Sequence, residues 1–352
     1  MEEEKQSSSQ SPLIWLLLLV IAAVGIYFLF TKVIDKGEEK SDMDGITLQL
    51  KWVEQGQFMG FLVAEKLGYY EEENIDIDIL PGGVGINPVD VLIAGHADIA
   101  VAWTGNVLPA ISLGEELVNI GQGMQRSGIR LMAFKENGVE SPADITGKSI
   151  GTWPGGNELE PYAFIEKQGL DRDRDVVLVN QNFDMNQLLN GEIDIASATI
   201  YNEYWLPIEA GYDESEFTVF DMEDEGVAML QDALFVKREY LEENEDLLVR
   251  FLKATIKGWE YAIQNPEDAI ERIDLDFIQG DETAKKHHIR MGVESGKLYK
   301  ADDGSTKGLF YINKDKLQQT VDIATKYIDE VKDIDTEKIY TLSIWEKATK
   351  DE

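Results

Sequence analysis

Aromatic and hydrogen-bonding side chains gather in this sequence at the points where predicted strands end. Trp52, Trp103 and Trp153 each close a segment whose apolar pattern is typical of a β-strand. Gln57 follows the first of them, and the run Tyr201–Trp205 (YNEYW) combines three aromatic rings with an amide and a carboxylate. Such rings stack on flat organic molecules, and amides and carboxylates bond to the polar edges of those molecules. These residues therefore predict recognition of a small organic ligand.

The candidate ligand contacts share a place at a strand end or in the turn that follows. Glu203 is expected to accept N–H bonds from a heteroaromatic ring, and free N–H groups near Asn157 to bind a polar or anionic edge. Other roles stay open: the tryptophans could be core residues, Gln57 could cap a helix, and Glu203 could be solvated. Asp232 precedes an apolar strand and is expected to face the ligand. The full set is Trp52, Gln57, Phe58, Trp103, Thr104, Trp153, Gly156, Asn157, Tyr201, Asn202, Glu203, Tyr204 and Asp232.

Residues that could carry catalysis or hold a metal are scarce. There is no cysteine, and the three histidines are His96, His287 and His288. His96 falls in a predicted turn, and adjacent histidines on a helix point apart. Because no nucleophile–base pair or metal-ligand spacing occurs, we expect no enzymatic activity, no metal and no cofactor.

The net charge of −35, from 67 acidic and 32 basic residues, argues against one class of partner. Nucleic-acid binding needs a basic surface, so we exclude it. The acidity is explained either by a well-solvated surface or by saline or alkaline surroundings.

Strands and helices are expected to alternate through the middle of the chain. Apolar or alternating patterns predict strands at 46–52, 75–79 and 98–103, and Asn87-Pro88-Val89-Asp90 is a typical helix start. This alternation indicates βαβ units with a mainly parallel sheet. The C-terminal third is predicted to be helical, and Trp259 lies on the apolar stripe of one helix, where a core position is expected.

An internal similarity suggests two lobes of one design. Leu92–Trp103 (LIAGHADIAVAW) and Leu188–Thr199 (LLNGEIDIASAT) share a helix end, a glycine, an aspartate and an apolar strand. Ligands of open α/β sheets bind beyond the carboxyl ends of the strands. Two lobes facing each other would therefore enclose a cleft lined by the aromatic residues named above.

An apolar segment near the N-terminus predicts a membrane anchor. Leu13–Phe30 carries no charge and approaches the roughly 20 residues that span a bilayer. Residues 1–12 would then form a cytoplasmic tail and 31–44 a tether. A cleaved signal peptide is the alternative, but bulky residues occupy the place of its small-residue cleavage site.

Several longer segments resemble the solute-binding proteins of ABC transporters, and within them the NMT1/THI5-like branch. The resemblance runs from about Ile46 to Ile270, and the phrases around Trp52 and Gln57 and at YNEY are its more specific parts. The segments are LKWVEQGQFMGFLVAEKLGYYEEENIDIDILPGG, SPADITGKSIGTWPGGNE, NQNFDMNQLLNGEIDIASATIYNEYW and ATIKGWEYAIQNPEDAI.

The resemblance implies a type II periplasmic-binding-protein fold, in which two α/β lobes close on the ligand about a hinge. Lobe I would comprise 45–130 and 230–352, and lobe II 131–229. The two crossover segments would lie near Ile129–Phe134 and Phe217–Asp232. The anchor would precede this domain and hold it on the outer side of the cell membrane.

The same resemblance implies capture of riboflavin or a thiamin-precursor pyrimidine and delivery to an ABC permease and its ATPase. A fungal enzyme of this family depends on a cysteine-rich segment and a histidine, and this chain lacks cysteine. Two alternatives remain. The protein could bind a sulfonate or nitrate, for which Arg126 and Arg130 are the nearby basic candidates, or it could be a ligand-sensing ectodomain.

Overall fold

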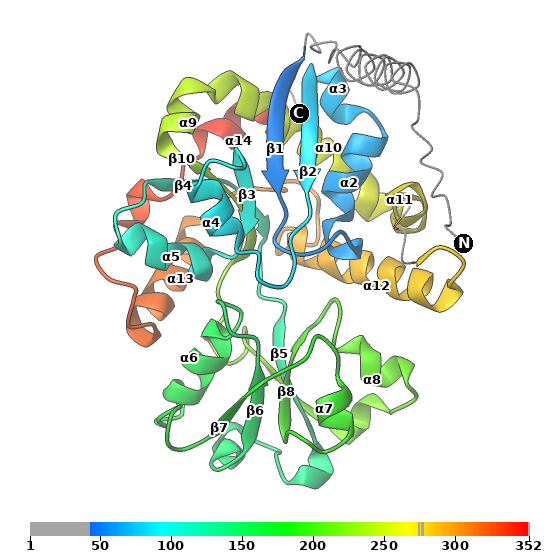
Figure 1. The fold of residues 1–352 in the computed structure, drawn as a ribbon, viewed down its shortest axis with the longest axis vertical. Helices are drawn as coiled ribbons and strands as arrows, with labels where there is room; N and C mark the ends of the chain where they lie inside the picture. The colour runs from blue at the N-terminus through cyan, green and yellow to red at the C-terminus, as the bar shows by residue number, and fades with distance from the viewer. Residues whose placement is uncertain (1–42, 274, 276–277, 351–352) are drawn as a thin grey trace, which may run out of the picture. The chain divides into compact units, whose positions relative to one another are not determined.

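The computed structural model describes residues 43–273, 275 and 278–350, which form two α/β parts, each built on a five-stranded sheet (Figure 1). We refer to the part on the first sheet as lobe I and to the part on the second as lobe II. The predicted anchor at 13–30 lies outside the described residues. Among the residues that are described, no helix combines the length and the apolar character that crossing a bilayer requires.

The sheet of lobe I is mixed. β1 runs parallel to β2 and β3, whereas β10 runs antiparallel to β3 and β4. Along β3, Ile99 and Val101 pack into one core cluster, while Ala100 and Ala102 pack into another, because successive side chains point to opposite faces. The strand order is β2 (Ile75–Leu80), β1 (Asp44–Gln49), β3 (Ile99–Ala102), β10 (Gln231–Lys237) and β4 (Leu117–Met124).

The sheet of lobe II repeats this design. β6 runs parallel to β7 and β8, and β5 runs antiparallel to β8 and β9. The strand order is β7 (Val177–Asn180), β6 (Ser149–Thr152), β8 (Ile195–Thr199), β5 (Ile129–Phe134) and β9 (Phe217–Asp221).

The internal similarity of the sequence corresponds to a shared hydrogen-bonding arrangement. Its aspartates, Asp98 and Asp194, stand just before β3 and β8. Asp98 accepts a hydrogen bond from the backbone N–H of Thr47 in β1 at 2.8 Å, and Asp194 accepts the equivalent bond from Ser149 in β6 at 2.8 Å. Each carboxylate therefore ties the middle strand of its sheet to a parallel neighbour, β3 to β1 in lobe I and β8 to β6 in lobe II.

The chain crosses between the sheets twice. It leaves β4 at Met124 and enters β5 at Ile129, so the first crossing is 125–128, just before the expected segment. It returns between β9 and β10, at 222–230, within the expected range. The proposed lobe boundaries at 130/131 and 229/230 stay predictions.

A buried carboxyl group lies where the two crossings meet. Glu160 accepts hydrogen bonds from the Ser127 hydroxyl at 2.6 Å and from the Gln231 amide at 3.1 Å. The same Gln231 side chain accepts from the N–H of Gly128 at 2.8 Å. Burial raises the pKa of Glu160 to about 8, so near neutral pH this group is held largely as the uncharged acid.

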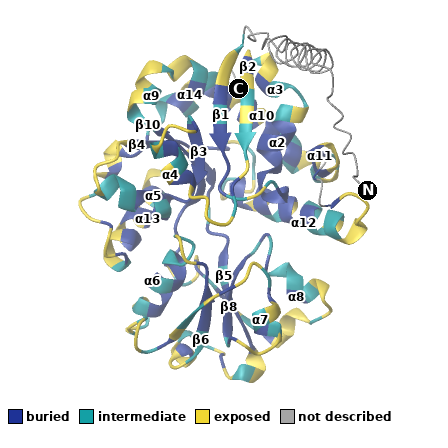
Figure 2. Ribbon diagram, viewed as in Figure 1, coloured by how far each residue is buried: buried dark blue, intermediate teal, exposed yellow. Residues whose placement is uncertain are grey.

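Helices surround both sheets, and the buried residues concentrate on the strands and on the helix faces turned toward them (Figure 2). The predicted capping by Asn87 is confirmed, because its side chain accepts from the Val89 N–H at 3.1 Å. The predicted core position of Trp259 is also confirmed, since it is fully buried and stacks on Tyr299. The helices are α2 (Met59–Lys66), α3 (Tyr69–Glu72), α4 (Pro88–Ile93), α5 (Thr104–Ser112), α6 (Leu159–Lys167), α7 (Asn186–Leu189), α8 (Trp205–Glu209), α9 (Arg238–Glu243), α10 (Glu245–Gln264), α11 (Pro266–Ile273), α12 (Glu282–Tyr299), α13 (Lys314–Tyr327) and α14 (Ser343–Ala348).

Candidate ligand-binding site

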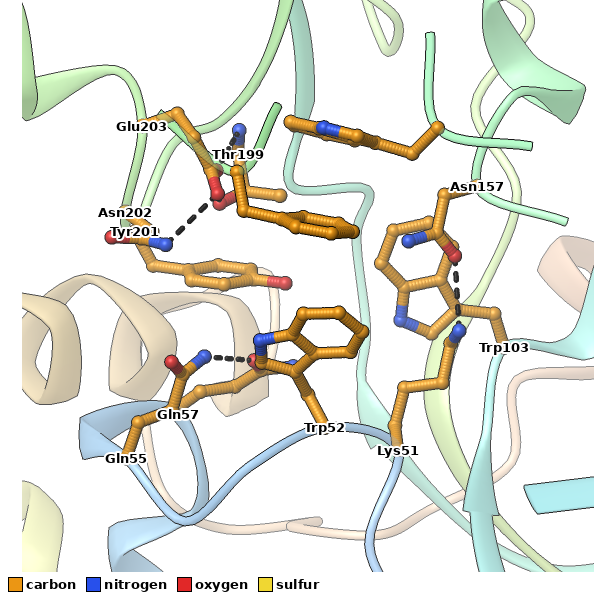
Figure 3. A pocket seen from close by; sticks show the side chains of 12 residues that line it. Lys51, Trp52, Gln55, Gln57, Trp103, Asn157, Thr199, Tyr201, Asn202 and Glu203 are labelled. Atoms are coloured by element: carbon orange, nitrogen blue, oxygen red, sulfur yellow. Dashed lines mark hydrogen bonds between the residues drawn. The ribbon is translucent and has the colours of Figure 1, made fainter. Parts of the chain in front are cut away.

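A cavity lies at the carboxyl ends of the central strands, where the two lobes meet. It encloses about 430 Å³ of space between atoms, part of it open to solvent. The position agrees with the rule that ligands of open α/β sheets bind beyond the strand ends. The lining residues are Lys51, Trp52, Gln55, Gln57 and Trp103 from lobe I, and Trp153, Asn157, Phe183, Thr199, Tyr201, Asn202 and Glu203 from lobe II (Figure 3).

The turn after β1 brings the lobe I residues to this cavity. Trp52 accepts a backbone hydrogen bond from Gly82, the second residue after β2, at 2.9 Å. A Cβ atom at Gly82 would lie only 2.7 Å from the Leu50 oxygen and the Trp52 nitrogen. Only glycine lets these two strand ends run this close together, and the close contact fixes where Trp52 stands.

Three aromatic rings stand side by side at the cavity. Phe183, in the loop after β7, has its ring centroid 4.6 Å from that of Trp52, at an interplanar angle of 48°. It is also nearly parallel to Trp153, at 14° and 6.2 Å. Phe183 remains 47% exposed although it touches both indoles. A planar ligand could stack on the Trp52 face that Phe183 contacts only if the Phe183 ring shifted.

Glu203 supplies a buried carboxylate to the cavity wall. One oxygen accepts from the backbone N–H of Thr199 at 3.0 Å and from its hydroxyl at 2.6 Å, and the other accepts from the Asn202 amide at 2.9 Å. Burial raises the pKa of Glu203 despite these hydrogen bonds, which favour the ionised form. The carboxylate is held in place and retains acceptor capacity toward the cavity.

Asp232 stands behind the wall and orients two lining side chains. It is fully buried and accepts hydrogen bonds from the Gln57 amide at 2.7 Å and from the Trp103 indole N–H at 2.9 Å. Gln57 in turn accepts from the amide of Gln55 at 2.9 Å. Burial raises the pKa of Asp232 to about 6. Its place in the structure is that of a positioning residue, and it does not line the cavity.

Lys51 is a cation at the cavity wall. Its side chain is only 9% exposed, and its ammonium group donates to the Asn157 Oδ1 atom of the other lobe at 3.0 Å. The ammonium also lies 5.3 Å from the centre of the Trp103 ring. Burial lowers the pKa of Lys51 to about 8, although the nearby carboxylates of Asp232 and Glu158 oppose this shift.

The structure brings eight of the predicted contacts to the cavity and places five elsewhere. Phe58 is fully buried in the lobe I core, because η1 (Gly56–Phe58) turns it inward. Thr104 is fully buried at the start of α5. Gly156 lies in a smaller neighbouring hollow, Tyr204 packs edge-on against Trp205, and Asp232 stands behind the wall as described above. The eight at the cavity are Trp52, Gln57, Trp103, Trp153, Asn157, Tyr201, Asn202 and Glu203.

Four lining residues were not among the candidates, namely Lys51, Gln55, Phe183 and Thr199. The sequence could have indicated Lys51 and Thr199, because Lys51 directly precedes Trp52 and Thr199 is the last residue of β8. Phe183 lies in the loop after the short strand β7, and the sequence around it contains no pattern that predicts a ligand contact.

Arg126 and Arg130, the candidates for an anion site, are not among the residues that line the cavity, and neither are the three histidines. Arg130 pairs with Asp221 at 2.6 Å, and Arg126 donates to the backbone oxygen of Lys297. His287 on α12 contacts Asn202 at 2.8 Å from behind. Among the described residues, no three His, Asp or Glu side chains gather as a metal site would require.

The two mixed sheets have matching strand orders, two crossings join them, and a cavity lies at their strand ends. This arrangement defines the periplasmic-binding-protein class of folds. The solved periplasmic aliphatic sulphonate binding protein SsuA from Escherichia coli shares this fold, with a TM-score of 0.63 and 14% identity over 84% of this chain and 91% of that one. The nitrate-binding protein NrtA from Synechocystis also shares it, with a TM-score of 0.57 and 10% identity over 88% and 89%. At such identities the likeness shows the fold alone.

The chain belongs to the family described as NMT1/THI5 like, whose sequence model matches residues 55–269. This confirms the resemblance noted in the sequence. The formylaminopyrimidine-binding protein of Halalkalibacterium halodurans is 25% identical over 257 residues, 72% of this chain and 76% of that protein. The 4-amino-5-hydroxymethyl-2-methylpyrimidine phosphate synthase of Legionella pneumophila is 26% identical over 230 residues, 64% and 72% of the two chains.

Proposed function

We propose that this protein is the extracytoplasmic solute-binding component of an ABC importer, and that it captures an amino-substituted pyrimidine of the thiamin-precursor type. The ligand would bind in the cavity between the lobes, which would close on it about the two crossings. Attachment to the membrane through the segment at 13–30 and delivery to a permease and its ATPase belong to the same proposal.

The observation that carries the ligand proposal is the buried Glu203 carboxylate beside aromatic rings. An aminopyrimidine offers N–H donors to such a carboxylate and a flat face to Trp52. A hydrogen bond to a charged group contributes roughly 1.5–3 kcal/mol, and an aromatic stack about 0.5–1.5 kcal/mol beyond area burial. The formylaminopyrimidine-binding relative supports a single ring over the fused rings of riboflavin.

The charge of the site argues against sulfonate or nitrate as the ligand. Glu203 lines the cavity and Asp232 lies just behind it, against the single ammonium of Lys51. Arg126 and Arg130, the candidates for an anion site, bond to other partners instead. A small anion would lie beside the Glu203 carboxylate and near that of Asp232, with one cation to offset them, which is unfavourable in a buried site.

We propose binding and not catalysis, although one relative bears the name of a synthase. The formylaminopyrimidine-binding relative supports this choice. A ligand that returns chemically unchanged from prolonged incubation with the protein is the expected result, and mass spectrometry would detect turnover.

Titration of the purified protein against a panel of compounds tests the proposed ligand class. The panel comprises 4-amino-5-hydroxymethyl-2-methylpyrimidine, its formylaminomethyl counterpart, riboflavin, taurine and nitrate, with binding followed by tryptophan fluorescence and calorimetry. We expect the two pyrimidines to bind more tightly than the others. Binding of taurine or nitrate alone would overturn the proposal, and binding of riboflavin alone would overturn the choice of a single ring.

A further inference from the structure

The cavity has different hydrogen-bonding character at its two ends. Glu203 and Thr199 lie at one end in Figure 3, Lys51 and Asn157 lie at the other, and Trp52 stands between them. The Glu203 end presents a carboxylate, which accepts hydrogen bonds. The Lys51 end presents an ammonium, which can only donate.

The Lys51 end is built from both lobes. The ammonium of Lys51, in the turn after β1, donates to Oδ1 of Asn157, in the loop before α6, at 3.0 Å. This contact uses the amide oxygen of Asn157, so its NH2 group adds further donor capacity. An ammonium carries three N–H groups, and Asn157 accepts one of them. A ligand oxygen placed here would therefore meet donors from both lobes at once.

The surrounding charges decide which kind of oxygen suits this end. The carboxylates of Asp232 and Glu158 lie close enough to act on Lys51 electrostatically, and they partly offset the cost of burying its positive charge. Lys51 is only 9% exposed as a residue, and its ammonium lies 5.3 Å from the Trp103 ring centre. A buried donor with carboxylates nearby suits a neutral acceptor such as an amide or formyl carbonyl better than a full anion, which the carboxylates would repel and whose own desolvation would be costly.

We propose that Lys51 and Asn157 form a second subsite, which selects pyrimidines carrying a neutral carbonyl substituent on the side of the ring away from the edge bound by Glu203. This inference rests on the proposed function and adds the residue pair that distinguishes substituted from unsubstituted rings. Because the pair spans the lobes, a bound carbonyl oxygen also links them.

The test compares two uncharged ligands that differ at one position. The first is the 4-amino-2-methylpyrimidine ring with a formylaminomethyl group at carbon 5, and the second has a methyl group there. Wild type should bind the first about tenfold or more tightly than the second, the ratio expected for a hydrogen bond to a charged donor. Lys51→Met should abolish most of this preference while still binding the methyl compound. Lys51→Arg should retain it in part.

Lys66→Met is the matched control, because Lys66 is an exposed lysine of the same lobe that pairs with Glu65. It should leave the preference unchanged. If Lys51→Met fails to fold, the wild type still gives the answer, since the preference should shrink between pH 7 and pH 9 as Lys51, with its pKa of about 8, loses its proton.

Three results would be decisive against the inference. A preference that survives Lys51→Met in folded protein overturns it, and so does a wild-type preference that stays constant between pH 7 and pH 9. Equal binding of both compounds by wild type overturns it while the proposed function stands. If neither compound binds, the proposed function itself fails.

Discussion

Replacement of Glu203 by glutamine isolates the contribution of one buried acceptor. In the wild type one carboxylate oxygen accepts hydrogen bonds from the Thr199 N–H and hydroxyl, and the other accepts one from the Asn202 amide. Glutamine keeps one oxygen and replaces the other with an NH2 group, which cannot accept. If the oxygen stays with Thr199, the remaining position presents a donor to Asn202 and to the N–H groups of the ligand.

The expected loss follows from these contacts. Removing one hydrogen bond to a charged acceptor costs roughly 1.5–3 kcal/mol, which corresponds to a roughly 10- to 150-fold weaker affinity. The fold should persist, because the side chain volume is almost unchanged and the Thr199 contacts can be kept.

Calorimetric titration with 4-amino-5-hydroxymethyl-2-methylpyrimidine measures the effect. Glu192→Gln is the control, since Glu192 is an exposed carboxylate of the same lobe and should not matter. The pH dependence adds an independent check. Because burial raises the pKa of Glu203, lowering the pH should protonate it earlier than an ordinary carboxyl group and weaken binding, and glutamine should remove that dependence. Binding by Glu203→Gln within about twofold of wild type, a difference well below 1 kcal/mol, would refute the reasoning.

Phe183→Ala should speed ligand association severalfold in stopped-flow fluorescence, because the ring that now contacts Trp52 and Trp153 would be gone; an unchanged association rate would show that the ring does not obstruct the ligand. Glu160→Gln should flatten the pH dependence of thermal stability. Burial raises the pKa of Glu160 in the folded protein from 4.5 to about 8. Between these pH values the unfolded chain releases a proton that the folded protein keeps, so wild-type stability falls as the pH rises, by up to about 1.4 kcal/mol per pH unit. Equal slopes in the two proteins would contradict this. Saturating pyrimidine should reduce the radius of gyration in small-angle scattering, and an identical profile at demonstrated saturation would count against closure of the lobes.

The two-lobed fold could be predicted because its signals are local and occur twice. The apolar strands, the capping by Asn87 and the aspartates at 98 and 194 each follow from neighbouring residues. The first crossing, at 125–128, lies directly before the segment Ile129–Phe134 that was predicted for it. β5 looks like a connector in the sequence, but it pairs with β8 and β9, and such long-range pairing leaves no local pattern.

The site was predictable in outline, because residues that follow a strand at its carboxyl end lie close to the cavity. Trp52, after β1, and Glu203, after β8, both follow this rule. Phe58 was placed wrongly because a short 3₁₀ turn rotates it into the core. Asp232 has a backbone φ of 46°, an uncommon conformation for a residue other than glycine, and its carboxylate bonds to Gln57 and Trp103 behind the wall. Phe183 was missed because its position depends on contact with the opposite lobe.

The matching carboxylate ties of the two lobes have a mechanical consequence. Asp98 locks β3 to β1 through a side-chain bond and a backbone bond from its own N–H to Thr47, and Asp194 locks β8 to β6 in the same way. Sliding either central strand along its neighbour would break both bonds together, so each sheet is stiff along the direction that ends at the cavity. If the lobes close on a ligand as proposed, the two sheets would move as stiff units, and the change in backbone conformation would fall on the segments 125–128 and 222–230 that join them.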